Sequence, residues 1–173
     1  KMAVKTKEKT IDRFQNIAHY ESEKIKDLKN LNEVYRYVLF KDKKYHIAEN
    51  RAEFIYIDLT VDDIEERSDI WKFFRQTCGS YEFVKRFRCT GIKDKTGALI
   101  FEGDIVEYKC GSEKVTACVT FINGGTGWNK GCSSVDSYQK YTVIISDILQ
   151  NPKLDWRAKE HMEEFGIKDY RKN

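Results

Sequence analysis

The chain has 173 residues, of which 40% are hydrophobic and 13% aromatic, including ten Tyr and ten Phe. This apolar content excludes a disordered chain, and the length suits one domain of ordinary size or two small ones. The formal net charge is +3, from 31 basic and 28 acidic residues. Because both signs are spread along the chain, charge alone indicates neither a nucleic-acid-binding arm nor an acidic mimic of nucleic acid.

Cysteine usage and hydropathy indicate a cytoplasmic protein. The cysteines form an odd set without a C-x-x-C pair and without histidines at zinc-finger spacing, so we expect reduced thiols that serve in packing; they are Cys78, Cys89, Cys110, Cys118 and Cys132. The sequence has no signal-peptide pattern and no apolar run near the roughly 20 residues that a membrane span needs.

The first 60 residues combine a helical pattern with a strand pattern. In residues 5–31 apolar side chains recur at helical spacing, which predicts one long helix or two short ones. Residues 34–40 and 53–59 are rich in β-branched and aromatic side chains, and residues 44–49 lie between them with polar turns on either side. This pattern predicts a three-stranded meander.

Residues 60–79 give the strongest helical signal. Thr60 or Asp62 suits the position of an amino-terminal cap, and Gly79 suits the end of the helix. From residue 80 onward the helical pattern disappears and glycines accumulate. We therefore expect a domain boundary between about residues 79 and 84, with an α/β region at 1–80 and a β-rich domain at 81–173.

The β-rich part is predicted to hold five strands, and the chain is predicted to end in a helix. The strands are expected near residues 83–90, 98–101, 104–110, 114–122 and 140–146, and the glycine-rich segment 123–134 is expected to be a loop. Asn151 followed by Pro152 predicts the start of a closing helix that runs through Phe165 and ends at Gly166.

The segment TGIKDKTGALIFEGDIVEYK at residues 90–109 carries glycines, lysines and acidic residues among alternating apolar positions. A phosphate-binding loop would need G-x-x-x-x-G-K-S/T, and an EF-hand would need acidic residues at alternating positions that end in glutamate. Neither spacing is present. The segment therefore predicts strands joined by tight turns at 94–97 and 102–104, where Gly97 provides a positive φ.

Two separated segments resemble the YopX-like proteins of phages and prophages, whose pattern is tGlkDknGkeIyeGDiV followed by vIGNIyeNPeLl. The resemblance covers about residues 83–155. It is carried by Thr90, Gly91, Asp94, Gly97, Ile100, Glu102, Gly103, Asp104, Ile105 and Val106, and then by Ile144, Asp147, Ile148, Asn151, Pro152 and Leu154. Ser146 stands where the family pattern has glycine, and residues 1–80 do not resemble the usual amino-terminal region of the family.

The resemblance implies a mobile-element origin and a small, strongly bent, β-barrel-like sheet, and it implies no catalytic residues. Together with the pattern of elements, it predicts an α+β fold. An amino-terminal helix, meander and helix would be followed by a YopX-type β-rich domain and a carboxy-terminal helix.

Residue types that perform catalysis are present but not grouped. His19, His46 and His161 are scattered, and His161 with Glu164, at helical i, i+3 spacing, is expected to lie on a solvated helix face; a metal site from His46 and Asp58 is also disfavoured. Cys132 has no histidine near it in sequence to activate its thiol. We therefore expect no catalytic residues, no metal, no cofactor and no enzymatic activity.

Two segments are candidates for binding. In FVKRFRC, strand alternation places Arg86 and Arg88 on one face, where they could bind phosphates or carboxylates, and Lys85 with the two phenylalanines on the other. The alternative is an exposed strand face without a binding role. The second candidate is Trp128, Asn129 and Lys130 in the glycine-rich loop, either as an interface anchor or as a lid over the barrel core.

These observations lead to a functional hypothesis. We expect a non-enzymatic binding protein in the cytoplasm of a bacterial host cell, where its partner is a host protein or ribonucleoprotein. The leading hypothesis is an anti-defence factor. Its most specific form is an anti-CRISPR inhibitor of an RNA-guided effector nuclease. The alternative is a nucleic-acid-binding accessory of phage replication or transcription that uses Arg86, Arg88, Lys93 and Lys95. A nuclease or other hydrolase would require a metal cluster that the sequence does not display.

Overall fold

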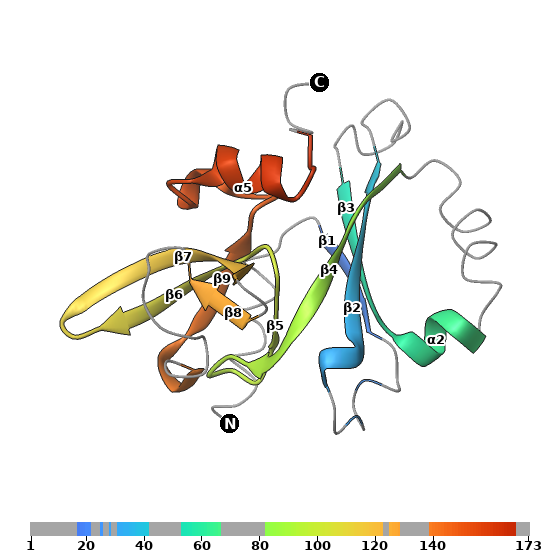
Figure 1. Ribbon diagram of the computed structural model, residues 1–173, viewed down its shortest axis with the longest axis horizontal. Coiled ribbons are helices and arrows are strands. Elements are labelled where there is room, and N and C mark those ends of the chain that lie inside the picture. Colours follow the sequence, from blue (N-terminus) through green and yellow to red (C-terminus); the bar gives the residue numbers. More distant parts are fainter. Residues whose placement is uncertain are drawn as a thin grey trace. The chain divides into compact units, whose positions relative to one another are not determined.

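The computed structural model describes residues 17–21, 25, 28, 31–41, 53–66, 82–122, 125–128 and 139–168, and this part of the chain is mostly β (Figure 1). The chain divides into two compact units, Lys1–Phe87 and Arg88–Asn173. The division falls a few residues after the expected boundary, inside strand β4 (Glu82–Lys93). No helix in the described residues is long and apolar enough to cross a membrane.

The first unit is built on a mixed sheet. Strand β2 (Val34–Lys41) pairs antiparallel with β3 (Glu53–Thr60) along its whole length, and β1 (Ile17–Glu21) pairs parallel with β3 on the other side. The order of strands in this unit is β1-β3-β2-β4. The β-branched and aromatic composition of β2 and β3 suits the centre of such a sheet.

Both faces of the β2–β3 pair are largely buried. Alternation along the strands places one apolar set on the first face, consisting of Tyr35, Tyr37, Leu39, Ile55, Ile57 and Leu59. The register pairs these residues directly across the two strands. The other face carries Val38 and Tyr56 as one cross-strand pair and Phe40 and Phe54 as another, with the rings of the latter two 5.1 Å apart. Cross-strand pairs of this kind stabilise a sheet.

Two sequence-based expectations for this unit are wrong. The expected meander would place residues 44–49 between two strands, but β2 and β3 are bonded directly to each other; residues 44–49 themselves lie outside the described residues. The expected helix at 5–31 is contradicted at β1. There, hydrogen bonding to β3 outweighs the local preference for a helix that the spacing of the apolar residues indicates. Residues 5–16 lie outside the described part.

Helix α2 (Val61–Glu66) begins where the sequence predicted a helix. The backbone amide of Asp63 donates to the Thr60 hydroxyl at 3.0 Å, and the Asp63 carboxylate accepts from the Thr60 backbone amide at 2.9 Å. This reciprocal pair is a capping box, which confirms Thr60 as the cap. Residues 67–79 of the predicted helix lie outside the described residues.

The second unit contains the end of β4 and a four-stranded antiparallel sheet in the order β8-β7-β6-β9. The elements are β5 (Leu99–Phe101), β6 (Asp104–Cys110), β7 (Glu113–Ile122), β8 (Gly125–Trp128), η4 (Gln139–Tyr141), β9 (Val143–Asp147), η5 (Pro152–Leu154) and α5 (Ala158–Glu164). The four strands predicted at 83–122 are confirmed, and β9 begins three residues later than expected.

The expectation of a barrel-like sheet is corrected, because the described strands form no closed barrel. The four-stranded sheet has β8 and β9 at its two ends, so it is open. The glycine-rich loop predicted at 123–134 is also partly wrong, since residues 125–128 form β8 and pair with β7. Backbone pairing across Gly125 and Gly127 does not need the side-chain alternation from which strands are recognised in a sequence.

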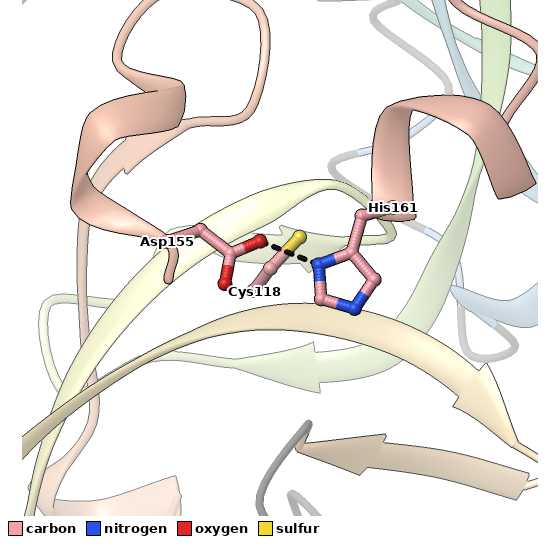
Figure 2. A group of neighbouring side chains, drawn as sticks. All are labelled: Cys118, Asp155 and His161. Carbon is pink, nitrogen blue, oxygen red and sulfur yellow. Dashed lines mark hydrogen bonds and ion pairs between the residues drawn. The ribbon is translucent and has the colours of Figure 1, made fainter. Parts of the chain in front are cut away.

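The β6–β7 pair buries both of its faces near the amino-terminal end of β6. One face packs into the main core of the unit, which consists of Ile92, Ile100, Val106, Tyr108, Ala117 and Val119 with Val115 and Ile144 at its margin. The opposite face carries Ile105 and Cys118, which are cross-strand neighbours and have no exposed area. This second face borders the carboxy-terminal segment that contains α5, as the position of Cys118 beside His161 shows (Figure 2).

The closing helix is shorter than predicted. Pro152 begins η5, the chain then becomes extended at Asp155, and α5 starts only at Ala158. Asn151 makes no side-chain cap hydrogen bond to the η5 backbone, and its side-chain amide instead donates to the Ser146 hydroxyl at 2.7 Å. The predicted end is confirmed, because Gly166 has a φ of 66° directly after Phe165.

Candidate functional site

The carboxylate of Asp94 organises the first turn of the 90–109 segment. Its Oδ1 accepts hydrogen bonds from the backbone amides of Thr96 and Ala98, at 2.7 and 3.0 Å, and from the Thr96 hydroxyl at 2.6 Å. Gly97 adopts a φ of 88° in this turn. The buried carboxylate therefore acts as an acceptor for backbone donors that the turn leaves without a ladder partner.

The second turn of the segment connects distant parts of the sheet. Gly103, with a φ of 82°, donates its amide to the carbonyl of Val119 and accepts from the amide of Ile148, each at 2.9 Å. The carboxylate of Asp104 accepts from the amide of Phe101 at 2.8 Å. In both motif turns, backbone amides donate hydrogen bonds to an aspartate carboxylate. In the second turn, Gly103 also bonds to the backbone of two distant residues.

The second segment of the motif uses the same chemistry. Asp147 Oδ1 accepts from the amides of Leu149 and Gln150, at 2.8 and 3.1 Å, and Oδ2 accepts from the Gln150 side chain. Ser146, which stands in place of the glycine of the family pattern, is buried and accepts from Asn151. The serine hydroxyl thereby gives the motif asparagine a partner.

A buried cluster of three ionisable side chains lies between β7 and the carboxy-terminal segment. Cys118 belongs to β7, Asp155 follows η5, and His161 belongs to α5, and one ligand atom from each lies within 4.8 Å of the others. The Nδ1 atom of His161 and Oδ2 of Asp155 are 2.5 Å apart (Figure 2). Asp155 Oδ1 accepts from the amide of Arg157 at 3.1 Å, which fixes the orientation of the carboxylate.

Burial sets the protonation state of the thiol in this cluster. Loss of hydration raises the pKa of Cys118 well above its ordinary value, and the negative charges of Asp155, Asp104, Asp147 and Glu102 raise it further. The thiol is therefore protonated at neutral pH. A protonated thiol without exposed area is a poor nucleophile, and this argues against nucleophilic catalysis at Cys118.

The sequence did not predict this cluster. His161 was expected on a solvated face with Glu164, but its exposed fraction is 1% and its partner is Asp155. One signal could have indicated burial: His161 precedes Phe165 by one helical turn, and Phe165 is also buried. The proximity of Cys118 depends on packing between distant segments, which no local pattern reveals.

The predicted arginine face on β4 is exposed. Arg86 lies with its guanidinium 4.6 Å from the centre of the Tyr35 ring, and Arg88 lies 4.7 Å from the centre of the Phe121 ring. Phe87 between them is buried, as strand alternation requires. We call Arg86 and Arg88 the β4 arginines. Each guanidinium lies over an aromatic ring of the same compact unit.

The remaining predicted binding residues are placed separately. Lys85 is half-buried, whereas Lys93 and Lys95 are exposed. The backbone of Trp128 pairs with Val119, and its side chain lies outside the described residues.

The other two residues predicted for the glycine-rich loop, Asn129 and Lys130, also lie outside the described part of the chain. The structure therefore brings the β4 arginines to the surface, but it does not test an interface at the glycine-rich loop.

Two apolar residues that the sequence analysis did not propose for binding are exposed on either side of a residue of the buried cluster. Leu154 is 45% exposed and Trp156 is 66% exposed, on either side of buried Asp155. The Arg157 guanidinium lies 5.8 Å from the centre of the Trp156 ring. Two exposed apolar side chains therefore flank a buried carboxylate that contacts His161.

Comparison with known protein families shows where this chain belongs. A family model described as YopX protein matches residues 35–155, which is more than two thirds of the chain. The chain belongs to the YopX family. The match extends the YopX family region upstream of the residues that carry the visible motif, and it includes β2, β3 and α2 of the first unit.

One of the similar solved structures shares little sequence identity with this chain. The crystal structure of protein EF1440 from Enterococcus faecalis is similar to this YopX family member at 17% sequence identity, with a TM-score of 0.35. The similarity covers 69% of this chain and 96% of that chain. No curated protein matches the sequence.

Proposed function

We propose that this YopX family member is a phage- or prophage-encoded binding protein without catalytic activity, which acts on the machinery of a bacterial host. Its sharpest form is an anti-defence factor that inhibits an RNA-guided CRISPR effector nuclease. The exposure and ring stacking of the β4 arginines carry the binding part of this proposal. The phage and host context comes from the resemblance of the motif segments to phage and prophage proteins.

The β4 arginines have the properties of binding residues. A guanidinium group stacked on an aromatic ring keeps its N–H donors directed outward along its edges, where a carboxylate or phosphate can accept two of them. Stacking also restricts the side chain before binding, which lowers the entropy cost of forming a complex. Leu154 and Trp156 offer a second kind of contact, because exposed tryptophan is frequent among interface residues that dominate binding energy.

The motif carboxylates are engaged in contacts that support the fold. Asp94, Asp104 and Asp147 each accept hydrogen bonds from backbone amides of their own unit. A carboxylate that serves turns in this way is occupied by structural contacts. The resemblance of these residues to the family pattern is thus explained by folding.

A protein partner fits the observed charges better than nucleic acid alone. Nucleic-acid binding depends on many phosphate contacts, whereas β4 presents three exposed basic residues, Arg86, Arg88 and Lys93, and one exposed acidic residue, Glu82. The net charge of +3 on 173 residues is also modest. Acidic side chains on a host protein or ribonucleoprotein would satisfy two guanidinium groups.

The decisive experiment is a plating assay in bacteria that carry an active RNA-guided nuclease directed against a test phage. Expression of this protein is expected to raise the plating efficiency of the phage by at least an order of magnitude. A strain that lacks the nuclease should show no change. No effect in several nuclease types would contradict the inhibitor form.

Variants of the β4 arginines connect the activity to the structure. Arg86→Ala combined with Arg88→Ala should abolish the plating effect. Lys109→Ala combined with Lys159→Ala removes the same charge from other exposed positions and should preserve it. Equal loss in both double variants would show that net charge, and not the β4 arginines, is responsible.

The alternative function, a nucleic-acid-binding accessory protein, has its own measurement. If Arg86, Arg88, Lys93 and Lys95 contact phosphates, affinity for single- or double-stranded DNA should fall steeply with salt. Replacing one such residue should reduce the slope of log affinity against log salt by about 1. A flat salt dependence would exclude this alternative.

A further inference from the structure

We propose that Cys118, Asp155 and His161 form a binding site for a divalent transition-metal ion, with zinc as the ion that their ligand chemistry suits best. This site is independent of the proposed binding function. It is formed entirely within the second compact unit, by one residue each from β7, the segment after η5, and α5 (Figure 2).

The three side chains supply the donor atoms that zinc uses in proteins. Zinc is bound by cysteine sulfur, histidine nitrogen and carboxylate oxygen, most often with four donors in a tetrahedron. The Sγ, Nδ1 or Nε2 and carboxylate atoms of these residues lie within 4.8 Å of one another. Three protein ligands leave the fourth position to a water molecule or another small donor, as in zinc sites with an open position.

Charge also favours an ion at this place. Binding of the ion would displace the proton of the Cys118 thiol to solvent. The resulting thiolate and the carboxylate would carry two negative charges and a neutral imidazole none, so a divalent cation would make the buried complex neutral. Burial of a net charge is costly, and a neutral complex avoids that cost. Asp104, Asp147 and Glu102 add negative potential around Cys118, which further favours a cation.

The His161–Asp155 pair requires only a small rearrangement to hold the ion. The Nδ1 atom of His161 and Oδ2 of Asp155 are 2.5 Å apart, a hydrogen-bonding distance. Tetrahedral zinc with bonds of about 2.0–2.1 Å places such atoms roughly 3.3 Å apart. The two atoms would therefore separate by less than about 1 Å, and the ion would take the place of the proton that they share.

The surroundings already orient the ligands. The Arg157 amide holds Asp155 Oδ1, which leaves Oδ2 directed at the imidazole. The ring of Phe165 lies 6.3 Å from the His161 ring, centre to centre, one helical turn further along the chain. Such supporting contacts around ligands tune metal affinity.

The test uses cobalt as a spectroscopic probe. Full-length protein is freed of metal with a chelator, the chelator is removed, and Co²⁺ is added. Binding through Cys118 is expected to produce a sulfur-to-cobalt charge-transfer band in the near ultraviolet, saturating at one Co²⁺ per chain, and Zn²⁺ should displace the band. Zn²⁺ should also raise the melting temperature of the metal-free protein.

Matched variants separate this site from adventitious binding. Cys118→Ser should remove the charge-transfer band, whereas Cys89→Ser, which changes another buried cysteine of the same unit, should retain it. His161→Gln should weaken Co²⁺ binding by at least about 10-fold. A band that persists in Cys118→Ser, or no band in the parent protein, would overturn the proposal.

A measurement on the unmodified protein guards against variants that do not fold. X-ray absorption of the zinc-loaded chain should show one sulfur at about 2.3 Å and nitrogen or oxygen at about 2.0–2.1 Å. A first shell without sulfur would overturn the site even if zinc were bound elsewhere on the protein.

Discussion

The carboxylate of Asp94 accepts a hydrogen bond from the backbone amide of Ile144, 50 residues further along the chain, at 3.1 Å. Nearby, the amide of Lys95 donates to the carbonyl of Thr142 at 3.0 Å. The two separated segments of the family pattern are therefore joined physically, because the first turn of one segment binds the strand that opens the other. Their occurrence together in the sequence has a structural cause.

Replacing Asp94 should destabilise the second unit. Asp94→Ala removes the side-chain acceptor of the Thr96, Ala98 and Ile144 amides, and we expect a loss of roughly 2–4 kcal/mol in the free energy of unfolding. Asp94→Asn keeps one carbonyl oxygen and should lose less. Chemical denaturation measures both, with Glu113→Ala as an exposed control. Equal stability of Asp94→Ala and the parent chain would refute the role of this carboxylate.

Substitution of Gly97 tests backbone strain alone, because a Cβ atom added there would make no steric clash. Its φ is 88°, and a Cβ atom added there would meet nothing within 4 Å. Gly97→Ala should therefore cost about 1 kcal/mol through backbone strain alone. Gly97→Asn should cost less, because asparagine tolerates positive φ better than alanine. Urea unfolding would contradict this account if alanine were neutral or stabilising.

The ion pair between Arg36 and Asp58 should show a strong asymmetry between single and double replacement. The guanidinium donates to both carboxylate oxygens, at 2.8 and 2.9 Å, and the Asp58 side chain is 2% exposed. Arg36→Met leaves a buried charge without this partner and should cost about 3–5 kcal/mol.

The double variant Arg36→Met with Asp58→Leu tests the same pair from the other side. It removes both charges and should recover part of the lost stability, because no buried carboxylate remains. Thermal and chemical unfolding measure the free energy of unfolding of both variants. A double variant no more stable than the single one would show that packing, and not charge, dominates here.

The titration of Cys118 should appear in the pH dependence of stability. Because burial raises its pKa above the ordinary value of 9.0, the folded state holds the thiol proton more tightly than the unfolded state does. The stabilisation is fully present below about pH 9 and is lost as pH rises further. Above that pH the parent chain should lose up to about 1.4 kcal/mol per pH unit from this group.

Serine variants measure this contribution in metal-free protein with a chelator present. Cys118→Ser cannot titrate in this range and should show a shallower fall in the free energy of unfolding between about pH 9 and 10.5. Cys89→Ser retains the Cys118 thiol and should fall as steeply as the parent chain. Parallel pH profiles for the parent and Cys118→Ser would be inconsistent with the raised pKa.

The sequence predicted strands well where side-chain alternation is strong. Residues 34–40, 53–59, 104–110 and 114–122 carry β-branched and aromatic side chains on alternating faces, and each forms a strand. The sequence failed at Ile17–Glu21, where local spacing favours a helix and pairing with β3 decides the outcome. It failed at β8, where glycines carry no alternation signal.

The two candidate sites also differ in how far the sequence could predict them. The exposure of Arg86 and Arg88 follows from strand alternation and could be predicted. The cluster of Cys118, Asp155 and His161 could not, because it depends on how α5 packs against β7. Local patterns predict which face a side chain occupies, and they do not predict which distant side chains meet there.

The pairing of β9 with β6 has a consequence for synthesis. The register joins Asp104 to Asp147, so the strand that completes one side of β6 is made well after β6 itself. Until then the free edge of β6 displays backbone donors and acceptors that another chain can bind. Translation that stops before Val143 would release a fragment with an open, aggregation-prone edge, and folding of the second unit is thereby coupled to synthesis beyond residue 147.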